Sequence, residues 1–313
     1  MLSVSILSAL LLATPLQPAP ATEPQLATLP EVEVTGVPER DAVHGFVGRV
    51  AAPATGRGLA RWRGPICPAT VNLRPEAAQP ILDRVSDISA ELHLRPGQPG
   101  CDPNLVIIFT NDGSALAQKM VENDARLFRV GVGGLDRGPA PLQAFQISEK
   151  PVRWWSLSMP VDKFGSRAVR VPGDQPRFIS PDIAEAAGCG GYDCPIAFAP
   201  IVEATTGSRL TNQTVDALYK VIVIVDLSKT GSVSAGQLGD YIAMISLAQI
   251  DMAAETSSYE TVLNLFDDAG PGMTDWDRAY LHSLYSQYAF PRSAYAQAGL
   301  IVNNMRRRVH SAP

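Results

Sequence analysis

The sequence predicts an α+β protein in which helices pack on a mixed β-sheet. Two apolar runs of strand length, residues 105–109 (LVIIF) and 220–226 (KVIVIVD), contain the β-branched residues that favour buried strands. Each run is followed by turn or N-cap residues and then by apolar residues at helical spacing. This order is typical of an α/β or α+β layer, and 313 residues are enough for one large domain or two small ones.

The first helix of the folded part is expected at residues 75–93. Pro75 stands where a helix begins, because its missing N–H costs nothing in the first turn. The apolar residues that follow at helical spacing are Ile81, Val85, Ile88 and Leu92.

The strand at 105–109 is followed by residues 111–114 (NDGS), which supply turn and N-cap chemistry for a helix through Leu116, Met120 and Leu127. Further on, residues 152–159 (VRWWSLSM) are the best strand candidate, and residues 167–171 alternate and can pair with them. We expect residues 172–218 to form a loop-rich excursion.

Capping boxes mark two helices of the C-terminal half. Ser234 and Gln237 have the required spacing, and so do Thr274 and Asp277, with Asp in the role of Glu. A last helix is expected over residues 292–309, with Arg306, Arg307 and Arg308 in its last turn, where cations favour the helix dipole.

The N-terminus predicts export. Residues 2–13 are apolar or small, a run too short for a bilayer span of about 20 residues but suited to a secretory signal. Ala19 and Ala21 form an A-x-A cleavage site, so we expect a signal peptide at 1–21 and a periplasmic or secreted protein. Because no Lys or Arg follows Met1, either the signal is atypical or the true start lies upstream; a disordered apolar N-terminus is the alternative.

Residues 22–58 are rich in Pro, Ala, Thr and Glu without a sustained period, which predicts an extended linker or a weakly ordered arm. Within it, residues 31–34 alternate and can add an edge strand. We therefore expect a single α+β domain at 59–309, with an N-terminal half at 59–171, the excursion at 172–218 and a helical half at 219–309.

Four cysteines, an even number, are consistent with an oxidising compartment. The simplest pairing joins neighbours in sequence, Cys67 with Cys101 and Cys189 with Cys194. The first bridge would close a loop of about 35 residues and stabilise the fold by roughly 3–4 kcal/mol on the loop-entropy model. A zinc site is the alternative, although no C-x-x-C pair is present and His93 is the nearest histidine in sequence.

The net charge and the hydropathy of the chain limit the kinds of partner that we expect. The net charge of −5 and the pI near 5.4 argue against nucleic acid as the main partner. No later stretch reaches 18 uninterrupted apolar residues, so we expect no transmembrane segment in the mature chain. An envelope protein or a glycan is the expected kind of partner.

Familiar catalytic and cofactor motifs are absent from the sequence. It lacks G-x-S-x-G, S-x-x-K, the phosphate-binding G-x-x-x-x-G-K-[ST] and H-E-x-x-H. His44, His93, His282 and His310 are far apart in sequence, so surface or capping roles are expected for them. We predict neither a cofactor nor a metal.

Carboxylates gather at Asp267, Asp268, Asp275 and Asp277. A calcium loop could use such a run, but the D-x-D-x-D-G spacing and the terminal Glu are missing. A catalytic carboxylate pair is another interpretation, because the separation of two carboxylates depends on the fold. Helix capping already accounts for Asp277.

Arginines and aromatic residues recur together, at residues 61–63 (RWR) and 153–155 (RWW). Aromatic rings stacked with arginine can bind glycans or peptides, so Trp154 and Trp155 are candidate ligand residues. Alternatively, adjacent tryptophans in a strand place one ring in the core and the other at the surface.

Several features of residues 219–290 occur together in one class of proteins. They are the β-branched strand at 221–225, a helix carrying Leu247, Ala248 and Gln249, and the segments 263–266 (LNLF) and 274–281 (TDWDRAYL). This stretch resembles the closing half of secreted bacterial proteins with zincin-type metallopeptidase architecture. The whole chain also resembles a family of exported alphaproteobacterial proteins without assigned activity.

In a zincin, two metal-binding histidines and a glutamate base occupy a helix of this kind. If Gln249 takes the place of the second histidine, Ile245 and Ser246 stand where His and Glu would be. None of the three can supply that chemistry, so the resemblance implies a degenerate scaffold whose mechanism is not carried over.

We therefore expect an exported, non-catalytic binding or structural component of the envelope. The alternative is a peptidase-like or glycan-acting hydrolase that uses carboxylates near Asp267 and Asp277, and calcium-dependent binding is a third interpretation. An inward-facing polar cluster around Asp240 and Gln249 would favour an enzyme, whereas apolar packing there would oppose it.

Overall fold

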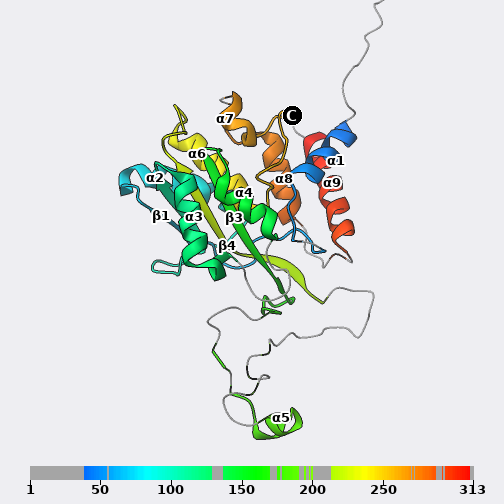
Figure 1. Cartoon of the computed structure of the whole chain (residues 1–313). Helices are drawn as coiled ribbons and strands as arrows, with labels where there is room; N and C mark the ends of the chain where they lie inside the picture. The colour runs from blue at the N-terminus through cyan, green and yellow to red at the C-terminus, as the bar shows by residue number, and fades with distance from the viewer. Residues whose placement is uncertain are drawn as a thin grey trace, which may run out of the picture. The chain divides into compact units, whose positions relative to one another are not determined.

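The computed structural model describes residues 39–54, 56–128, 137–169, 175–176, 178–189, 194, 197, 199, 213–268, 270, 272–286, 291 and 293–310. In this part, the chain is an α+β protein built on a four-stranded mixed sheet with the strand order β1-β2-β4-β3 (Figure 1). The signal peptide expected at 1–21, the edge strand expected at 31–34 and most of the excursion at 172–218 lie outside the described residues.

Three strands of the sheet run parallel. They are β1 (Pro68–Val71), β2 (Leu105–Thr110) and β4 (Val215–Asp226), and β2 is in register with β4 from the Leu105–Val221 pair to the Thr110–Asp226 pair. The fourth strand, β3 (Val152–Val161), lies antiparallel along the outer side of β4. The predicted strands at 105–109, 152–159 and 220–226 are confirmed, whereas β1 was not expected from the sequence.

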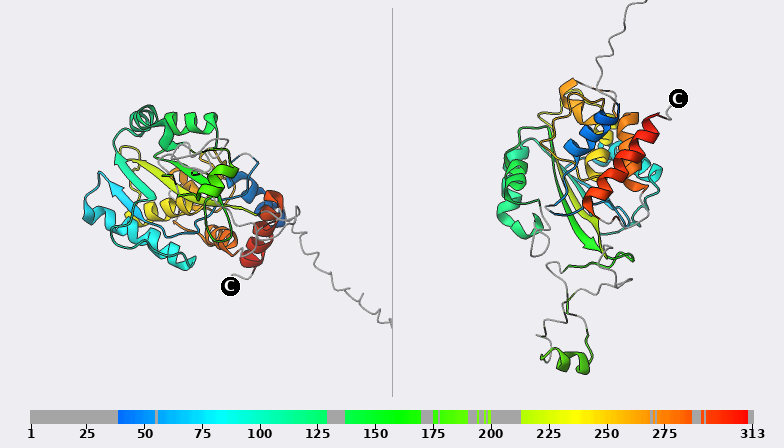
Figure 2. Two further views of the ribbon diagram at one scale, coloured as in Figure 1. Left: turned by 90° about the horizontal axis from the view of Figure 1, so that it is seen from below. Right: turned by 90° about the vertical axis from the view of Figure 1, so that its right-hand side faces the viewer.

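Helices cover both faces of the sheet (Figure 2). On one face, α2 (Pro75–Glu91) packs against α6 (Ala235–Leu247). The other face is covered by α3 (Gly113–Asn123), the short 3-10 turn η1 (Ala125–Phe128) and α4 (Pro139–Ile147). Because both faces are buried, the β4 segment from Val221 to Val225 is apolar without interruption.

A further layer of helices lies beyond α6. It contains α8 (Asp275–Tyr285), α9 (Ala294–His310) and α1 (Glu39–Val50), with α9 packed against both of the others. The remaining short helices are α5 (Pro181–Ala186), η3 (Val262–Asn264) and α7 (Leu265–Asp268). Both predicted capping boxes are present, at Ser234 with Gln237 and at Thr274 with Asp277.

Within the stretch 22–58, expected to be an extended linker or a weakly ordered arm, helix α1 corrects the prediction for residues 39–50; residues 22–38 lie outside the described part. Its buried residues are Val43, Phe46, Val47 and Val50, which recur at helical spacing and form one apolar face. Phe46 meets the rings of Tyr259, Trp276 and Tyr280 edge-on, with centroids 5.2–5.7 Å away. The folded part therefore includes residues 39–50, and the Pro- and Ala-rich composition of the stretch as a whole concealed this short periodic segment.

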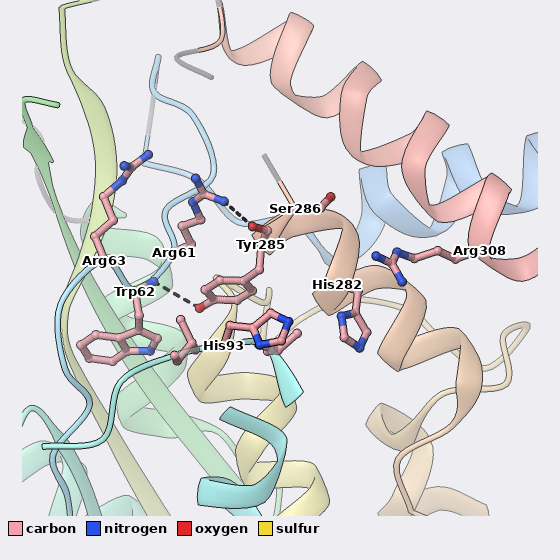
Figure 3. Close-up of a pocket in the computed structure, with 10 residues that line it drawn as sticks. Arg61, Trp62, Arg63, His93, His282, Tyr285, Ser286 and Arg308 are labelled. Carbon is pink, nitrogen blue, oxygen red and sulfur yellow. Dashed lines mark hydrogen bonds between the residues drawn. The ribbon is translucent and has the colours of Figure 1, made fainter. Parts of the chain in front are cut away.

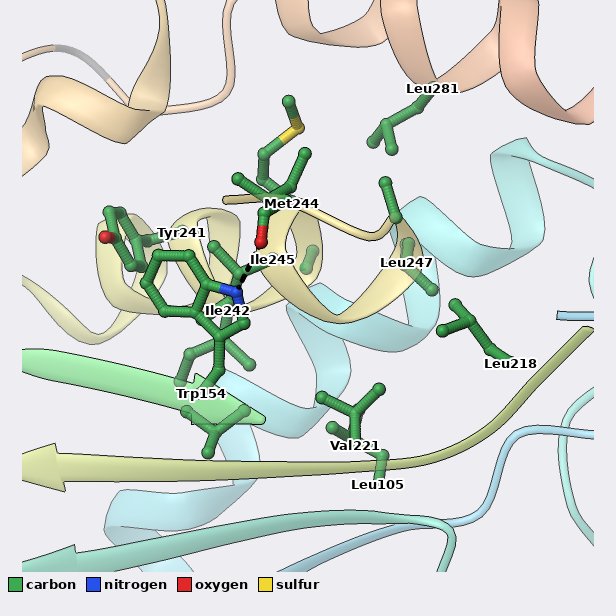
Figure 4. Close-up of a cluster of buried hydrophobic side chains, with 14 of the residues drawn as sticks. Leu105, Trp154, Leu218, Val221, Tyr241, Ile242, Met244, Ile245, Leu247 and Leu281 are labelled. Atoms are coloured by element: carbon green, nitrogen blue, oxygen red, sulfur yellow. Dashed lines mark hydrogen bonds between the residues drawn. The ribbon is translucent and has the colours of Figure 1, made fainter. Parts of the chain in front are cut away.

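The main core lies between the sheet and α6 (Figure 4). Trp154 on β3 packs edge-on against Tyr241 of α6, with the ring centroids 6.2 Å apart. Ile242 and Ile245 from the same helix, together with Val221 of β4, are fully or almost fully buried. Large branched and aromatic side chains thus fix α6 on the sheet by apolar contact.

Both predicted disulfides are formed. Cys67 pairs with Cys101 and Cys189 pairs with Cys194, with Cα atoms 6.2 Å and 5.2 Å apart. The first bridge ties the start of β1 to the loop that precedes β2. Two bonded cysteine pairs fit a secreted, disulfide-bonded protein. Among the described helices, none combines the length and the apolar character that a bilayer span requires.

Candidate anion-binding pocket

The helix expected to carry Leu247, Ala248 and Gln249 ends at Leu247, and Ala248 is extended, so Gln249 lies beyond α6. The three positions aligned with the expected His, Glu and His are all buried, where a catalytic site would need access. Ile245 and Ser246 are 0% exposed and Gln249 is 1% exposed. The Gln249 carboxamide oxygen accepts from the backbone N–H of Ala60 (2.8 Å), and its NH₂ donates to the hydroxyl of Ser158 (3.1 Å). Gln249 therefore joins the segment before β1 to strand β3 inside the core.

The predicted acidic residues do not form one cluster with Asp240 in the described part of the chain. Asp240 pairs with Arg84 of α2, and it accepts from the backbone N–H of Met273 (3.0 Å). Asp267 is exposed on α7, and the side chain of Asp268 lies outside the described residues. Asp240 is thus engaged in holding α2 and the loop before α8 against α6.

Asp277 is buried and completes the capping box of α8. Its carboxylate accepts from the Thr261 hydroxyl, the Val262 backbone N–H (2.7 Å) and both the backbone N–H and the hydroxyl of Thr274. Burial raises the pKa of Asp277, and these hydrogen bonds oppose that rise. Asp275 is exposed at the helix start. In the described part of the chain, no group of three or more His, Cys, Asp or Glu residues is arranged to hold a metal ion.

Trp154 and Trp155 are both buried, one on each side of the sheet. The indole N–H of Trp154 donates to the carbonyl of Ile250 (3.0 Å), and that of Trp155 donates to the carbonyl of Phe128 (2.9 Å). The expectation of one core ring and one surface ring is corrected, because helices cover both faces of the sheet. Neither ring is available to stack on a ligand.

A pocket of about 370 Å³ opens instead beside the C-terminal turn of α8. Its lining comes from four segments that are distant in sequence: residues 61–63, residues 92–94 at the end of α2, the end of α8, and α9. Five basic side chains take part, and Figure 3 shows them around one space. They are Arg61, Arg63, His93, His282 and Arg308.

Two contacts with Tyr285 hold the arginine-bearing segment in place. The phenolic oxygen of Tyr285 accepts from the backbone N–H of Trp62 (3.2 Å) and donates to the carbonyl of Leu247 (2.7 Å). The guanidinium of Arg61 donates to the carbonyl of Leu284 (3.1 Å). It also donates to the carbonyl of Tyr285 (2.9 Å), as Figure 3 shows. The last carbonyls of α8 therefore orient Arg61, as expected for a cation at a helix C-terminus.

Trp62 anchors the same segment in the core. Its indole N–H donates to the carbonyl of Ser246 (2.8 Å), and the ring is buried. The carbonyl of the preceding residue, Arg61, accepts from the backbone N–H of Leu218 on β4. Trp62 therefore points into the core, and its two neighbours in sequence, Arg61 and Arg63, line the pocket.

The pocket is cationic. The pKa of Arg63 is lowered to about 10. Burial is the larger cause, and the positive charge of the nearby Arg61 is the smaller one. Burial also lowers the pKa of His282, and Arg308 lowers it further. Among the described residues, no carboxylate lines the pocket; Glu91, nearby, is paired with Arg278. An anion that enters this space would relieve the repulsion between like charges.

The sequence contained parts of this pocket but not their assembly. In the sequence, residues 61–63 form an arginine–tryptophan group, Arg308 stands at the end of a predicted helix, and the two histidines are far apart. Their convergence depends on how α2, α8 and α9 pack, and no linear spacing encodes that. Comparisons with protein-family models, with curated proteins and with solved structures found no match for this chain.

Proposed function

We propose that this protein is an exported, non-catalytic binding component of the bacterial envelope, and that its ligand presents a carboxylate or phosphate group to the pocket of Arg61, Arg63 and Arg308. The convergence of three arginines and two histidines, with no carboxylate among the described lining residues, carries the proposal. Arginine forms paired, charge-assisted hydrogen bonds with both kinds of anion.

Export is supported by the N-terminal signal pattern and by the two disulfides. The degenerate peptidase-like scaffold is part of the same proposal, on the basis of the resemblance over residues 219–290. Its loss of activity is supported by the burial of Ile245, Ser246 and Gln249, since their side chains pack or hold backbone groups inside the core. The separate partners of Asp240 and Asp277 likewise favour binding over hydrolysis.

The pocket has the dimensions of a small-molecule site. Ligand pockets commonly enclose about 300–1,000 Å³, and this one encloses about 370 Å³. Its walls are predominantly polar and charged, with Leu92 and Leu94 on one side. An acidic sugar would match this lining, because its carboxylate can reach the arginines while its ring contacts the partly exposed Leu94.

Calorimetric titration of the full chain with galacturonate, inorganic phosphate and neutral galactose tests the proposal. We expect saturable binding of an anion and no binding of galactose. Because a hydrogen bond to a charged group contributes about 1.5–3 kcal/mol, Arg63→Gln and Arg308→Gln should each weaken binding by about tenfold or more.

The matched control is Arg74→Gln, which removes the same charge from an exposed residue outside the pocket. Binding of neither anion, or equal weakening by Arg74→Gln, would contradict the proposal. Unfolding midpoints of all the variants should be measured alongside, so that a loss of folded protein is not taken for a loss of affinity.

A further inference from the structure

A second cationic cavity lies on the other side of the C-terminal turn of α9. It encloses about 700 Å³ and is lined by Arg40, Asn303, Arg306, Arg307 and His310. Arg40 comes from the first turn of α1, which packs along α9, and the other four residues come from α9 itself. As in the first pocket, none of the described residues that line this cavity carries a carboxylate.

The two cavities share one helix end. Arg308 lines the first cavity, and its neighbours Arg306 and Arg307 line the second. Successive residues of an α-helix are turned by about 100° around its axis, so Arg306 and Arg308 point to different sides of α9. An α-helix with its side chains is about 10–12 Å across. A ligand that contacts both cavities must therefore be an oligomer.

We propose that the natural ligand is an acidic polysaccharide that crosses the C-terminal turn of α9 and places successive carboxylates in the two cavities. This inference rests on the proposed function, since the first cavity is the site described above. Arginines of this one turn line both cavities, so a polyanion that crosses the turn can meet cationic side chains on both sides of it.

Two other polyanions fit this surface less well. Single-stranded nucleic acid binds where exposed aromatic rings accept the bases. Trp62, the tryptophan of the first cavity, is buried, and the exposed Tyr295 lies in the first turn of α9, outside the lining of both cavities. An anionic membrane favours a basic surface with exposed apolar side chains beside it. The lining of the second cavity includes no apolar residue among those described.

The test measures the affinity of the full chain for galacturonate and for oligogalacturonates of increasing length. For the wild type, we expect affinity to rise at least tenfold once the oligomer spans both cavities. The double variant Arg40→Gln/Arg306→Gln should bind the monomer within twofold of wild type, yet lose at least tenfold in affinity for the long oligomer. Salt should weaken oligomer binding less in this variant, because fewer charges are engaged.

The possible outcomes separate the two proposals. If Arg63→Gln leaves monomer binding unchanged, the proposed function fails, and this inference fails with it. If the monomer binds as expected but the long oligomer binds no tighter, or binds the double variant as well as the wild type, only the extended site is overturned. Tighter binding of a thymidine oligonucleotide or of vesicles containing anionic lipid would overturn the assignment to a polysaccharide.

Discussion

The phenolic oxygen of Tyr285 lies 3.2 Å from the backbone nitrogen of Trp62 and accepts its hydrogen bond. This contact joins the last turn of α8 to the segment that precedes β1. The same oxygen donates to the carbonyl of Leu247 at the end of α6, 2.7 Å away. One side chain thus fixes the relative positions of three segments, and two arginines of the cationic pocket flank the residue that it holds.

Tyr285→Phe should destabilise the protein and weaken anion binding together. The substitution removes the partner of two backbone groups, at Trp62 and at Leu247, and leaving such groups unsatisfied costs about 1–3 kcal/mol. Urea unfolding measures the loss. Tyr295→Phe is the control, since Tyr295 is 87% exposed, and it should change the free energy of unfolding by less than about 0.5 kcal/mol. An equal change in the free energy of unfolding in the two variants would show that the Tyr285 hydroxyl does not stabilise the fold.

Gln249→Leu tests the structural role of the Gln249 carboxamide in the core. The variant leaves the backbone N–H of Ala60 without its acceptor in the core, so the free energy of unfolding should fall by about 1–3 kcal/mol. The control, Gln79→Leu, removes an exposed carboxamide from α2 and should change it by less than about 0.5 kcal/mol. An unchanged or raised stability in Gln249→Leu would refute this role.

Phe46→Ala tests whether α1 belongs to the folded unit. Phe46 is 0% exposed and touches three aromatic rings, so its truncation should cost about 3–5 kcal/mol. Phe178→Ala removes the same side chain from a site that is 93% exposed and serves as the control. If the two substitutions had similar small effects on thermal unfolding, residues 39–50 would be the linker that their surrounding composition indicated.

Anion affinity should increase as the pH falls. Burial and the neighbouring Arg308 lower the pKa of His282, with smaller effects from Glu91, which raises it, and from Arg278 and His93, which lower it. His282 is therefore neutral near pH 7 in the free protein, and a bound anion favours its protonated form. Proton uptake then accompanies binding, so affinity rises with acidity.

The measurement is the affinity for sulfate, whose charge is constant between about pH 5 and pH 7.5, the range in which an imidazole titrates. His282→Asn should flatten the profile. A profile that His282→Asn leaves unchanged would exclude this histidine from the site.

The central fold was largely predictable because its signals are local. The β-branched run at 220–226 and the capping boxes at Ser234 and Thr274 each determine an element from a few neighbouring residues, and the structure has all three. Helix α1 also had a local signal, the spacing of Val43, Phe46, Val47 and Val50. That signal was masked because composition averaged over residues 22–58 is dominated by its Pro- and Ala-rich surroundings.

The pocket could not be predicted in the same way. His93 ends up beside His282 and Arg308 only because α2, α8 and α9 converge, and a sequence without an alignment does not reveal which helices meet. The spacing of Ile245, Ser246 and Gln249 predicts three residues on one helix, but α6 ends at Leu247 and is buried from Leu238 to its end. Spacing along a helix fixes which residues share a face, but only packing decides whether that face meets solvent.

The most direct test of the account is a nuclear magnetic resonance titration that follows the imidazole rings of the full chain. Individual rings are assigned with His93→Asn and His282→Asn, and galacturonate is then added. The account predicts saturable shifts of both rings, which are lost in the double variant Arg63→Gln/Arg308→Gln. Rings that do not respond, or that respond equally in the double variant, would contradict an anion site at this pocket.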